Sequence, residues 1–425
     1  MKLKLLACVP AITLLAVLVL PTQCLAQEPK HKLPHYTVVD LGTLGGTFSL
    51  AGGLNNRGAV VGESYLLGDT VVHAFLWQKG SMTDLGTLGG QNSYATWPFN
   101  DSNQIGGASE TSTPDPNAED FCGFGAGTGL ACLPFLWQKG VMTALPTLGG
   151  TNGAAYEVNN WGVVVGAAEN TTVDSTCPPP RVLRWKPVFW YQGKVHELPT
   201  LQGDTVGTAF VINDLGLIAG ASRTCDVFAP HPVLWQYGKI VQLGNLGGTA
   251  GLTVGINNWG QVTGESNLHG DTTAHAFLWQ KHTGMIDLGT LSGDVSSSGD
   301  GINDLGQIVG GSCDSDENCR AFLWQYGVMT DLNTLIPPDS TLYLIEATGT
   351  INNRGQIAGY AYDTVSGEFH AFLLNPCDRD GSCAGQGRDL TNSAPRVRPQ
   401  LPDNIRRLLQ QRNQRGHLHF RQPFK

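Results

Sequence analysis

The stretch HGDTTAHAFLWQ, from His269 to Gln280, contains the residue types of a metal site. His269, Asp271 and His275 lie within seven residues, and imidazole and carboxylate groups are common zinc ligands. The segment LGDTVVHAFLWQ repeats Asp271 and His275 as Asp69 and His73, but it has no counterpart of His269. A catalytic metal centre needs three protein ligands in one place. We therefore predict that His275 opens a strand and packs or bonds against a loop, and we predict no metal site.

Other short motifs give no stronger indication of chemistry. The segments CDSDENC at Cys313 and CDRDGSC at Cys377 hold closely spaced carboxylates but lack the distal Glu of a calcium loop. The Gly-Gly pairs lack the Lys-Ser/Thr and the following helix of a phosphate loop. No G-x-S-x-G element occurs with a plausible triad. The sequence therefore predicts no catalytic residue and no cofactor, and it favours a protein that is not an enzyme.

The cysteines indicate an oxidising compartment. Two of the ten lie in the first 26 residues, which leaves an even number. No CxxC pair suggests zinc, so we predict four disulfides. The cysteines concerned are Cys122, Cys132, Cys177, Cys225, Cys313, Cys319, Cys377 and Cys383. Three pairs are neighbours in sequence, and Cys177 with Cys225 would then bridge two successive repeats.

Internal repetition is the strongest signal in the chain. A turn of the type NNRG, NDSN, NNWG or NDLG occurs seven times. The copies begin at Asn55, Asn100, Asn159, Asn213, Asn257, Asn303 and Asn352. Each turn precedes an alternating apolar segment that ends near a Gly, which is typical of a β-hairpin. In the second copy Asn103 replaces the final Gly, and Asn tolerates the left-handed conformation that we expect there.

A second hairpin of the type HAFLWQKGSMTDLGTL follows in each repeat except the last, which stops after HAFLLNP. The missing strand stands at the other end, where HYTVVDLGTLGG begins at His35 without a partner before it. Four-stranded units of this period predict an all-β, seven-bladed β-propeller closed by its N-terminal strand. The recurrent aromatic residues, such as Phe75 and Trp77, would pack between blades. A β-solenoid is the alternative fold.

The same motifs carry a family resemblance. The segments HAFLWQKGSMTDLGTLGG and INNRGQIAG resemble the HAF-repeat family of exported bacterial proteins, whose tripeptide stands here at His73, His275 and His370. The resemblance covers about Tyr36 to Leu374 and implies an exported repeat protein, but little about activity. The third and fourth repeats depart from the pattern, since they read PVFW and PVLW.

The two ends differ from the body. Residues 1–26 have the basic start, apolar run and small-residue site of a secretory signal peptide, followed by a short linker over 27–35. Residues 376–425 form a basic tail that we expect to be mobile, with ten Lys or Arg against four Asp. The propeller over 36–375 is acidic, and residues 27–375 carry a net charge of −17. That charge argues against nucleic acid as a partner. No later segment could span a membrane, so we expect a secreted monomer, periplasmic or extracellular.

The irregular repeats suggest where function lies. The hairpin Asn and the aromatic motif of the following strand lie 21 or 22 residues apart in five repeats, but further apart in the second and third. These insertions precede the FLW strand, in the loop class that holds six of the cysteines. Loops on a rigid scaffold often carry binding function. We predict a non-enzymatic binding module whose contact surface is Glu110–Leu133 and Asn170–Arg184, with an envelope component, polysaccharide or protein as ligand. An extracellular polymer-acting hydrolase or lyase and a structural envelope protein are the alternatives.

Overall fold

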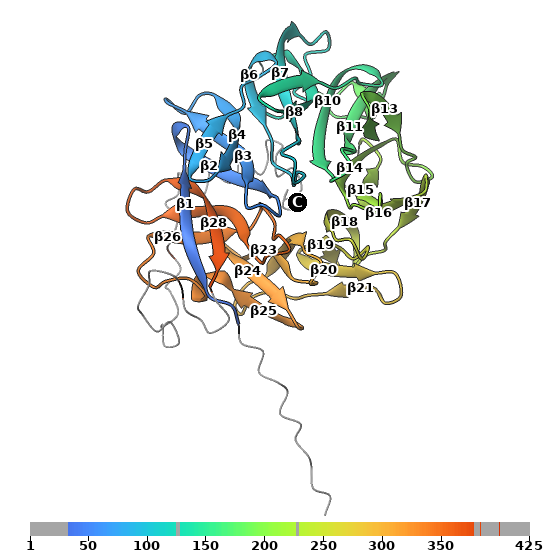
Figure 1. Cartoon of the computed structure of the whole chain (residues 1–425). Coiled ribbons are helices and arrows are strands. Elements are labelled where there is room, and N and C mark those ends of the chain that lie inside the picture. Colours follow the sequence, from blue (N-terminus) through green and yellow to red (C-terminus); the bar gives the residue numbers. More distant parts are fainter. Residues whose placement is uncertain (1–32, 125–127, 227–228, 378–382, 384–398, 400–425) are drawn as a thin grey trace, which may run out of the picture. The chain divides into compact units, whose positions relative to one another are not determined.

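Short antiparallel strands make up most of the chain in the computed structural model, which describes residues 33–124, 128–226, 229–377, 383 and 399. The predicted signal peptide, most of the linker and nearly all of the basic tail lie outside these residues. The strands form seven groups of four that follow one another around a ring (Figure 1). The predicted all-β, seven-bladed propeller is therefore confirmed, and the solenoid alternative does not describe the fold.

Each blade is built from four strands that are consecutive in sequence and in space, except for the blade that closes the ring. Blades 1 to 3 are β2 (Gly45–Leu54), β3 (Val60–Leu66), β4 (Val72–Gln78), β5 (Ser81–Asp84); β6 (Gly89–Tyr94), β7 (Ile105–Pro114), β8 (Leu130–Gln138), β9 (Val141–Ala144); β10 (Gly149–Val158), β11 (Val164–Val173), β12 (Leu183–Tyr191), β13 (Lys194–Glu197). Blades 4 to 6 are β14 (Val206–Ile212), β15 (Ile218–Arg223), β16 (His231–Gln236), β17 (Lys239–Gln242); β18 (Gly247–Ile256), β19 (Val262–Leu268), β20 (Ala274–Gln280), β21 (Gly284–Asp287); β22 (Ser296–Ile302), β23 (Ile308–Cys313), β24 (Cys319–Gln325), β25 (Val328–Asp331).

Blade 7 contains strands from both ends of the described chain. Its strands are β26 (Leu342–Glu346), β27 (Ile357–Asp363), β28 (Phe369–Pro376) and β1 (Tyr36–Gly42), and a 3-10 turn, η1 (Leu332–Thr334), precedes β26. Strand β1 pairs antiparallel with β28, from Tyr36 opposite Pro376 onward. The predicted closure by the N-terminal strand is confirmed, and it removes the open sheet edge that β28 would otherwise present.

The hydrophobic core lies between adjacent blades. Phe135 of blade 2 packs against Leu76 and Val61 of blade 1, and Phe75 of blade 1 packs against Ala371 and Leu373 of blade 7. Both phenylalanines are fully buried. Burying an aromatic side chain of this size contributes about 1.5–3 kcal/mol. The recurrent aromatic position in the repeats is therefore the packing position between blades, as the sequence predicted.

The repeated Gly after the apolar pair of each second strand allows close packing within the blade. A Cβ atom on Gly62 would lie 1.9 Å from the carbonyl oxygen of Leu50, and one on Gly264 would lie 1.9 Å from that of Leu252. Real Cβ atoms do not approach a backbone oxygen so closely, so any larger residue would push the inner strand away. The glycine at this position thus allows the first two strands of each blade to lie close together.

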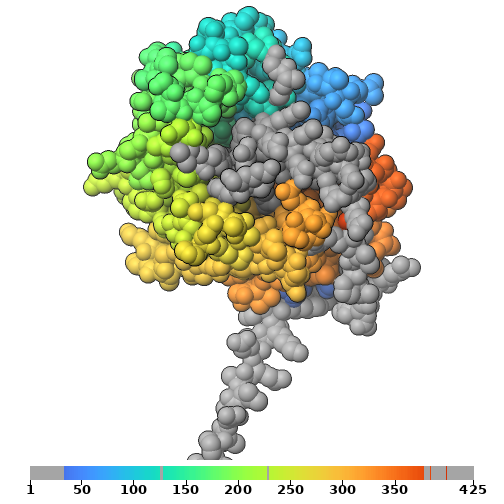
Figure 2. Space-filling view, turned by 180° about the vertical axis from the view of Figure 1, so that it is seen from behind, coloured from blue at the N-terminus to red at the C-terminus, as the bar shows by residue number. Residues whose placement is uncertain are grey.

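Consecutive antiparallel strands place their connections at alternate ends, which gives the propeller two distinct faces. The turn face carries the seven turns that begin at Asn55, Asn100, Asn159, Asn213, Asn257, Asn303 and Asn352. The insertion face carries the loops between the second and third strands. Viewed from behind, the blades again follow one another in chain order around the ring (Figure 2). No helix among the described residues is long and apolar enough to cross a membrane.

Candidate functional site

The two long insertions connect the second and third strands of blades 2 and 3, where the sequence placed them. One spans residues 115–129, between β7 and β8, and the other spans 174–182, between β11 and β12. Their exposed residues are mainly Ser, Thr, Pro and Asn, and Val173 is an exposed apolar side chain beside them. Several charged side chains, including Asp115, Glu119 and Asp174, are buried instead. The outer surface of the insertions is therefore polar and largely uncharged.

Hydrogen bonds join the two insertions into one unit. The buried carboxylate of Glu119 accepts hydrogen bonds from the backbone N–H groups of Val182 and Leu183, at 2.9 and 3.3 Å. In return, the Arg181 guanidinium donates to the carbonyl oxygen of Phe121 at 3.1 Å. It also lies over the Phe121 ring, 4.6 Å from the centroid. Hydrogen bonds to charged groups are stronger than neutral ones, so these contacts fix the loops of two blades against each other.

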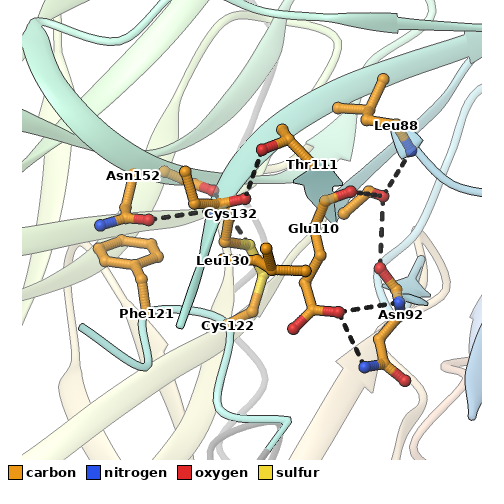
Figure 3. The surroundings of a disulfide bond; sticks show 12 residues. Leu88, Asn92, Glu110, Thr111, Phe121, Cys122, Leu130, Cys132 and Asn152 are labelled. Carbon is orange, nitrogen blue, oxygen red and sulfur yellow. Dashed lines mark hydrogen bonds between the residues drawn. A yellow bond between two sulfur atoms is a disulfide. The ribbon is translucent and has the colours of Figure 1, made fainter. Parts of the chain in front are cut away.

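Buried polar contacts also surround the disulfide between Cys122 and Cys132 (Figure 3). The Glu110 carboxylate accepts from the backbone and the side-chain nitrogen of Asn92, at 3.0 and 2.8 Å. On the other side, the side-chain oxygen of Asn152 accepts from the backbone N–H of Cys132 at 2.9 Å. These three polar side chains come from β7, β6 and β10, so neighbouring strands of blades 2 and 3 anchor the stapled loop.

Two of the other three disulfides tie loops of the same face. Cys177 pairs with Cys225, which links the insertion of blade 3 to blade 4. Cys313 pairs with Cys319 across a short loop of blade 6, and Cys377 pairs with Cys383 after the last strand. Within the CDSDENC loop the Asp314 carboxylate accepts from the backbone N–H groups of Asp316 and Asn318. That carboxylate therefore caps the turn inside the disulfide.

Burial shifts the ionisation of groups beneath the insertions. Burial, together with the nearby Glu119 carboxylate, raises the pKa of Glu169 to about 8. Burial also lowers the pKa of Arg223 to about 10, with a further contribution from Arg181. Glu169 Oε1 and Arg181 Nη1 make no hydrogen bond within the described part of the chain. Glu169 is consequently protonated in part at neutral pH, and this face combines an uncharged exterior with a polar interior.

The histidines of the HAF tripeptide bind acidic residues on the neighbouring strand. His73 Nδ1 lies 2.8 Å from an Asp84 oxygen, and His275 Nδ1 lies 2.9 Å from Asp287. The hydrogen bond to Asp84 raises the pKa of His73. His73 Nε2 also contacts the backbone carbonyl of Gln91 on β6. His275 is the second residue of β20, so its predicted place at the start of a strand is confirmed, but its carboxylate partner was not predicted.

The sequence contained a signal for these pairs that was overlooked. In five blades the third strand has a cation two residues before the residue aligned with Phe75, and the fourth strand has an acid opposite that residue. In blade 4 the aligned cation, His231, has Gln242 at the fourth-strand position and binds Asp204 instead. The pairs are His73 with Asp84, Lys186 with Glu197, His275 with Asp287, Arg320 with Asp331 and, across the closure, His370 with Asp40. Blade 2 lacks both members and has Leu133 and Ala144. The paired occurrence shows that this is a cross-strand contact of the blade.

The candidate metal ligands His269, Asp271 and His275 have separate surroundings. The Asp271 carboxylate accepts from the backbone N–H and the hydroxyl of Thr249, which lowers the pKa of Asp271. Asp69 makes the same two contacts with Thr47. Throughout the described ranges, no three His, Cys, Asp or Glu side chains are arranged to hold a metal ion. Asp271, like Asp69, therefore holds its loop against the first strand of the same blade through a threonine.

The seven turns bind one another in a closed ring on the turn face. The side-chain oxygen of each leading Asn accepts from two N–H groups of its own turn, as Asn55 does from Arg57 and Ala59. Its Nδ2 donates to the carbonyl oxygen of the leading Asn in the next blade, at 2.9–3.2 Å. We call these residues the first ring: Asn55, Asn100, Asn159, Asn213, Asn257, Asn303 and Asn352. The last bond, from Asn352 to Asn55, closes the circle.

A second ring lies directly beside the first. It consists of Asn56, Asp101, Asn160, Asp214, Asn258, Asp304 and Asn353. Each backbone N–H donates to the side-chain Oδ1 of the next member, at 2.8–3.0 Å. Because only Oδ1 is needed as the acceptor of this bond, either Asn or Asp can occupy the position. The sequence located these turns, but the bonds between blades were not predicted. The left-handed conformation expected at Asn103 is confirmed.

The two rings surround a cavity of about 130 Å³ at the mouth of the central channel. Glu157 lines it and has no acidic counterpart at the same position of the other repeats. Burial, partly offset by a hydrogen bond from the backbone of Ile212, raises the pKa of Glu157 to about 8. Trp97 and Phe210 each precede a residue that lines the cavity, and they stack with their ring centroids 5.2 Å apart. These two aromatic side chains come from blades 2 and 4, so they meet on the channel side of the inner strands.

No protein-family model and no curated protein matches the sequence. Solved structures match at the level of the fold. The β-propeller domain of the Trilobed protease from Pyrococcus furiosus has a TM-score of 0.44 at 11% identity, covering 68% of this chain and 84% of that one. A puromycin-hydrolyzing peptidase from Mycobacterium tuberculosis has a TM-score of 0.48 at 11% identity, covering 80% of this chain and 56% of that one. AofleA from Arthrobotrys oligospora has a TM-score of 0.39 at 9% identity, covering 69% and 87%. The chain thus spans little more than half of the peptidase and resembles propellers generally.

Proposed function

We propose that this chain is an exported, non-enzymatic binding module related to the HAF-repeat proteins. The four disulfides and the signal-like residues 1–26 support export to an oxidising compartment. The ligand is an envelope component, a polysaccharide or a protein. The pairing of β1 with β28 of the same chain supports a monomer, because this edge of β28 is then not available to a strand of another chain.

The insertion unit is the observation that carries this proposal. Buried contacts of Glu119 and Arg181 join the loops of blades 2 and 3, and Cys177 with Cys225 ties them to blade 4. Loops that are ordered before binding lose little conformational entropy when a ligand arrives. A rigid surface over the described residues of Glu110–Leu133 and Asn170–Arg184 is suited to binding and does not require catalytic groups.

Retention on an envelope fraction tests this function. The full protein with its disulfides intact should bind the fraction, and Val173→Arg should weaken retention by about tenfold, because Val173 is exposed beside the insertions. Leu67→Arg is the matched control, since Leu67 is also exposed but lies in the corresponding short loop of blade 1. Equal effects of the two substitutions would remove the insertion unit as the contact surface. Absence of retention of the unsubstituted protein would favour the structural alternative.

The enzyme alternative has one observation in its favour. Glu157, protonated in part at neutral pH, lines the mouth cavity together with Asp214, and one protonated acid beside one carboxylate is the arrangement of many hydrolases. Asp214, however, belongs to the repeated second ring and accepts hydrogen bonds from Asn160. Turnover of any extracellular polymer that is abolished by Glu157→Gln, in a protein that still folds, would establish this alternative.

A further inference from the structure

Large exposed apolar side chains gather on the turn face, opposite the insertions. The third position of the turns holds Trp161, Leu215, Trp259 and Leu305 in four successive blades, and we call these residues the apolar arc. Their exposed fractions are 73%, 69%, 76% and 71%. Contiguous exposed apolar residues usually mark a contact site on a soluble protein. The arc follows the rim of the mouth cavity and was not predicted from the sequence.

The two indoles of the arc are held in place. Trp161 Nε1 donates to the carbonyl oxygen of Asp214, and Trp259 Nε1 donates to that of Asp304, both at 2.9 Å. Each indole thus reaches the turn of the next blade. A fixed aromatic ring loses little conformational entropy on binding, which is one reason why Trp is common at recognition surfaces. The repeated geometry in blades 3 and 5 makes two ordered aromatic surfaces beside one cavity.

The other part of the rim is polar and carries hydrogen-bonding atoms that remain available. The third turn position there holds Arg354, Arg57 and Ser102, in blades 7, 1 and 2. In the second ring, Asn56 and Asp101 use Oδ1 for the ring bonds. Asn56 Nδ2 and Asp101 Oδ2 bind no other group among the described residues. One donor and one acceptor therefore stand side by side at the mouth, in neighbouring blades.

The charges of the rim nearly balance. Three carboxylates of the second ring, from Asp101, Asp214 and Asp304, face two exposed guanidinium groups from Arg57 and Arg354. Burial raises the pKa of Glu157 to about 8, so this carboxyl adds little negative charge below neutral pH. A rim of mixed sign with little net charge gives no long-range attraction to a strongly charged polymer. It does suit a ligand whose groups both donate and accept hydrogen bonds.

We propose that the turn face binds an uncharged polysaccharide, with one sugar unit at the mouth cavity and adjoining units on Trp161 and Trp259. Sugar hydroxyls donate to Asp101 Oδ2 and accept from Asn56 Nδ2. The apolar C–H faces of the sugar rings pack on the indoles. A cavity of about 130 Å³ admits no more than a small ligand or one terminal unit. This inference names a ligand class and a second surface, and it rests on the proposed binding function only in treating the chain as a non-enzymatic binder.

Titration calorimetry of the full, disulfide-intact protein with defined hexasaccharides tests the proposal. The uncharged probes are cellohexaose, xylohexaose, maltohexaose and N-acetylated chitohexaose. The charged probes are hexagalacturonate and deacetylated chitohexaose, and an Arg–Leu hexapeptide represents a protein ligand. We expect at least one uncharged sugar to bind without being cleaved and more tightly than every other probe. Binding confined to a charged sugar or to the peptide would overturn the ligand class, and binding of none of the uncharged sugars would overturn the proposal.

Substitutions locate the site and separate it from the insertion surface. Trp161→Ala and Trp259→Ala should each weaken sugar binding by about tenfold or more. Tyr237→Ala is the matched control, because Tyr237 is also an exposed aromatic residue and lies in an outer hairpin of the same face, and it should change affinity by less than about twofold. Unchanged affinity in both tryptophan variants would overturn the site. Val173→Arg should leave sugar binding intact, so retention on the envelope fraction fails or survives independently of this result.

Discussion

At the residue scale, one side chain performs two tasks in every blade. The Oδ1 atom of each first-ring Asn closes its own turn, and its Nδ2 atom binds the next blade. An Asp at this position could close the turn but could not bind the next blade, because a carboxylate has no hydrogen-bond donor. The second ring needs only the oxygen, and it contains Asp in three of seven places. The different residue usage of two adjacent positions therefore follows from which atoms make the bonds.

Substituting adjacent residues in one turn tests this account. Asn55→Asp removes the donor to Asn100 and buries a carboxylate, so it should lower the free energy of unfolding by about 1–3 kcal/mol or more. Asn56→Asp keeps the oxygen that the ring uses, and it should change stability by less than about 0.5 kcal/mol. Denaturant unfolding of the two variants gives the comparison. Similar losses for both would show that the amide donors do not join the blades.

The sequence allowed some of these roles to be predicted and concealed others. The turns, the left-handed Asn103 and the structural nature of His73 follow from repetition, because a residue that recurs in every unit marks the scaffold. The bonds from Nδ2 to the next blade could not be predicted from one repeat, since their partner lies 44 to 59 residues away in six cases and 297 residues away for the bond that closes the ring. The partial protonation of Glu157 depends on burial, which sequence does not give.

At the element scale, the closure of the ring depends on a pH-sensitive contact. His370 on β28 binds the Asp40 carboxylate on β1 at 2.8 Å and also contacts Glu368. The hydrogen bond to Asp40 raises the pKa of His370. A histidine whose pKa is raised in the folded state stabilises it fully below the unfolded value of about 6.5, and this contribution is lost as pH rises through the folded pKa.

Comparing pH values should reveal this contribution. Asp40→Asn should lower the melting temperature more at pH 6 than at pH 8.5, because the imidazolium that Asp40 binds is present only at the lower pH. Thermal unfolding of the substituted and unsubstituted proteins at both pH values measures the difference. A difference that does not vary with pH would contradict the assigned role of the protonated His370.

The disulfides should stabilise the fold to different extents, according to the length of the loops that they close. Cys177 and Cys225 are 48 residues apart and join two blades, whereas Cys313 and Cys319 are 6 residues apart within one loop. Loop-closure entropy predicts a stabilisation of about 4 kcal/mol for the first and about 2 kcal/mol for the second. Replacing each pair by Ser and measuring the unfolding midpoint compares them. A larger loss for the Cys313 pair would contradict the proposed anchoring of the insertions.

At the scale of the whole molecule, the propeller has two unlike faces. The insertion face has stapled loops with buried charges, and the turn face has fixed indoles around a cavity. The length of the insertions allowed one face to be predicted as a contact surface from the sequence alone. The second surface was not predicted, because Trp161 and Trp259 occupy turn positions that vary between repeats, and nothing in the repeat pattern indicates that they are exposed together.

The central claim is that this propeller binds an extracellular polymer without transforming it. The most direct measurement incubates the full, disulfide-intact protein with uncharged polysaccharides and envelope fractions, and follows both retention of the protein and release of shorter products. We expect saturable retention at a stoichiometry of one ligand per chain at each surface, with no product above that of the polymer alone. Product formation that depends on Glu157, or no retention on any polymer, would contradict the claim.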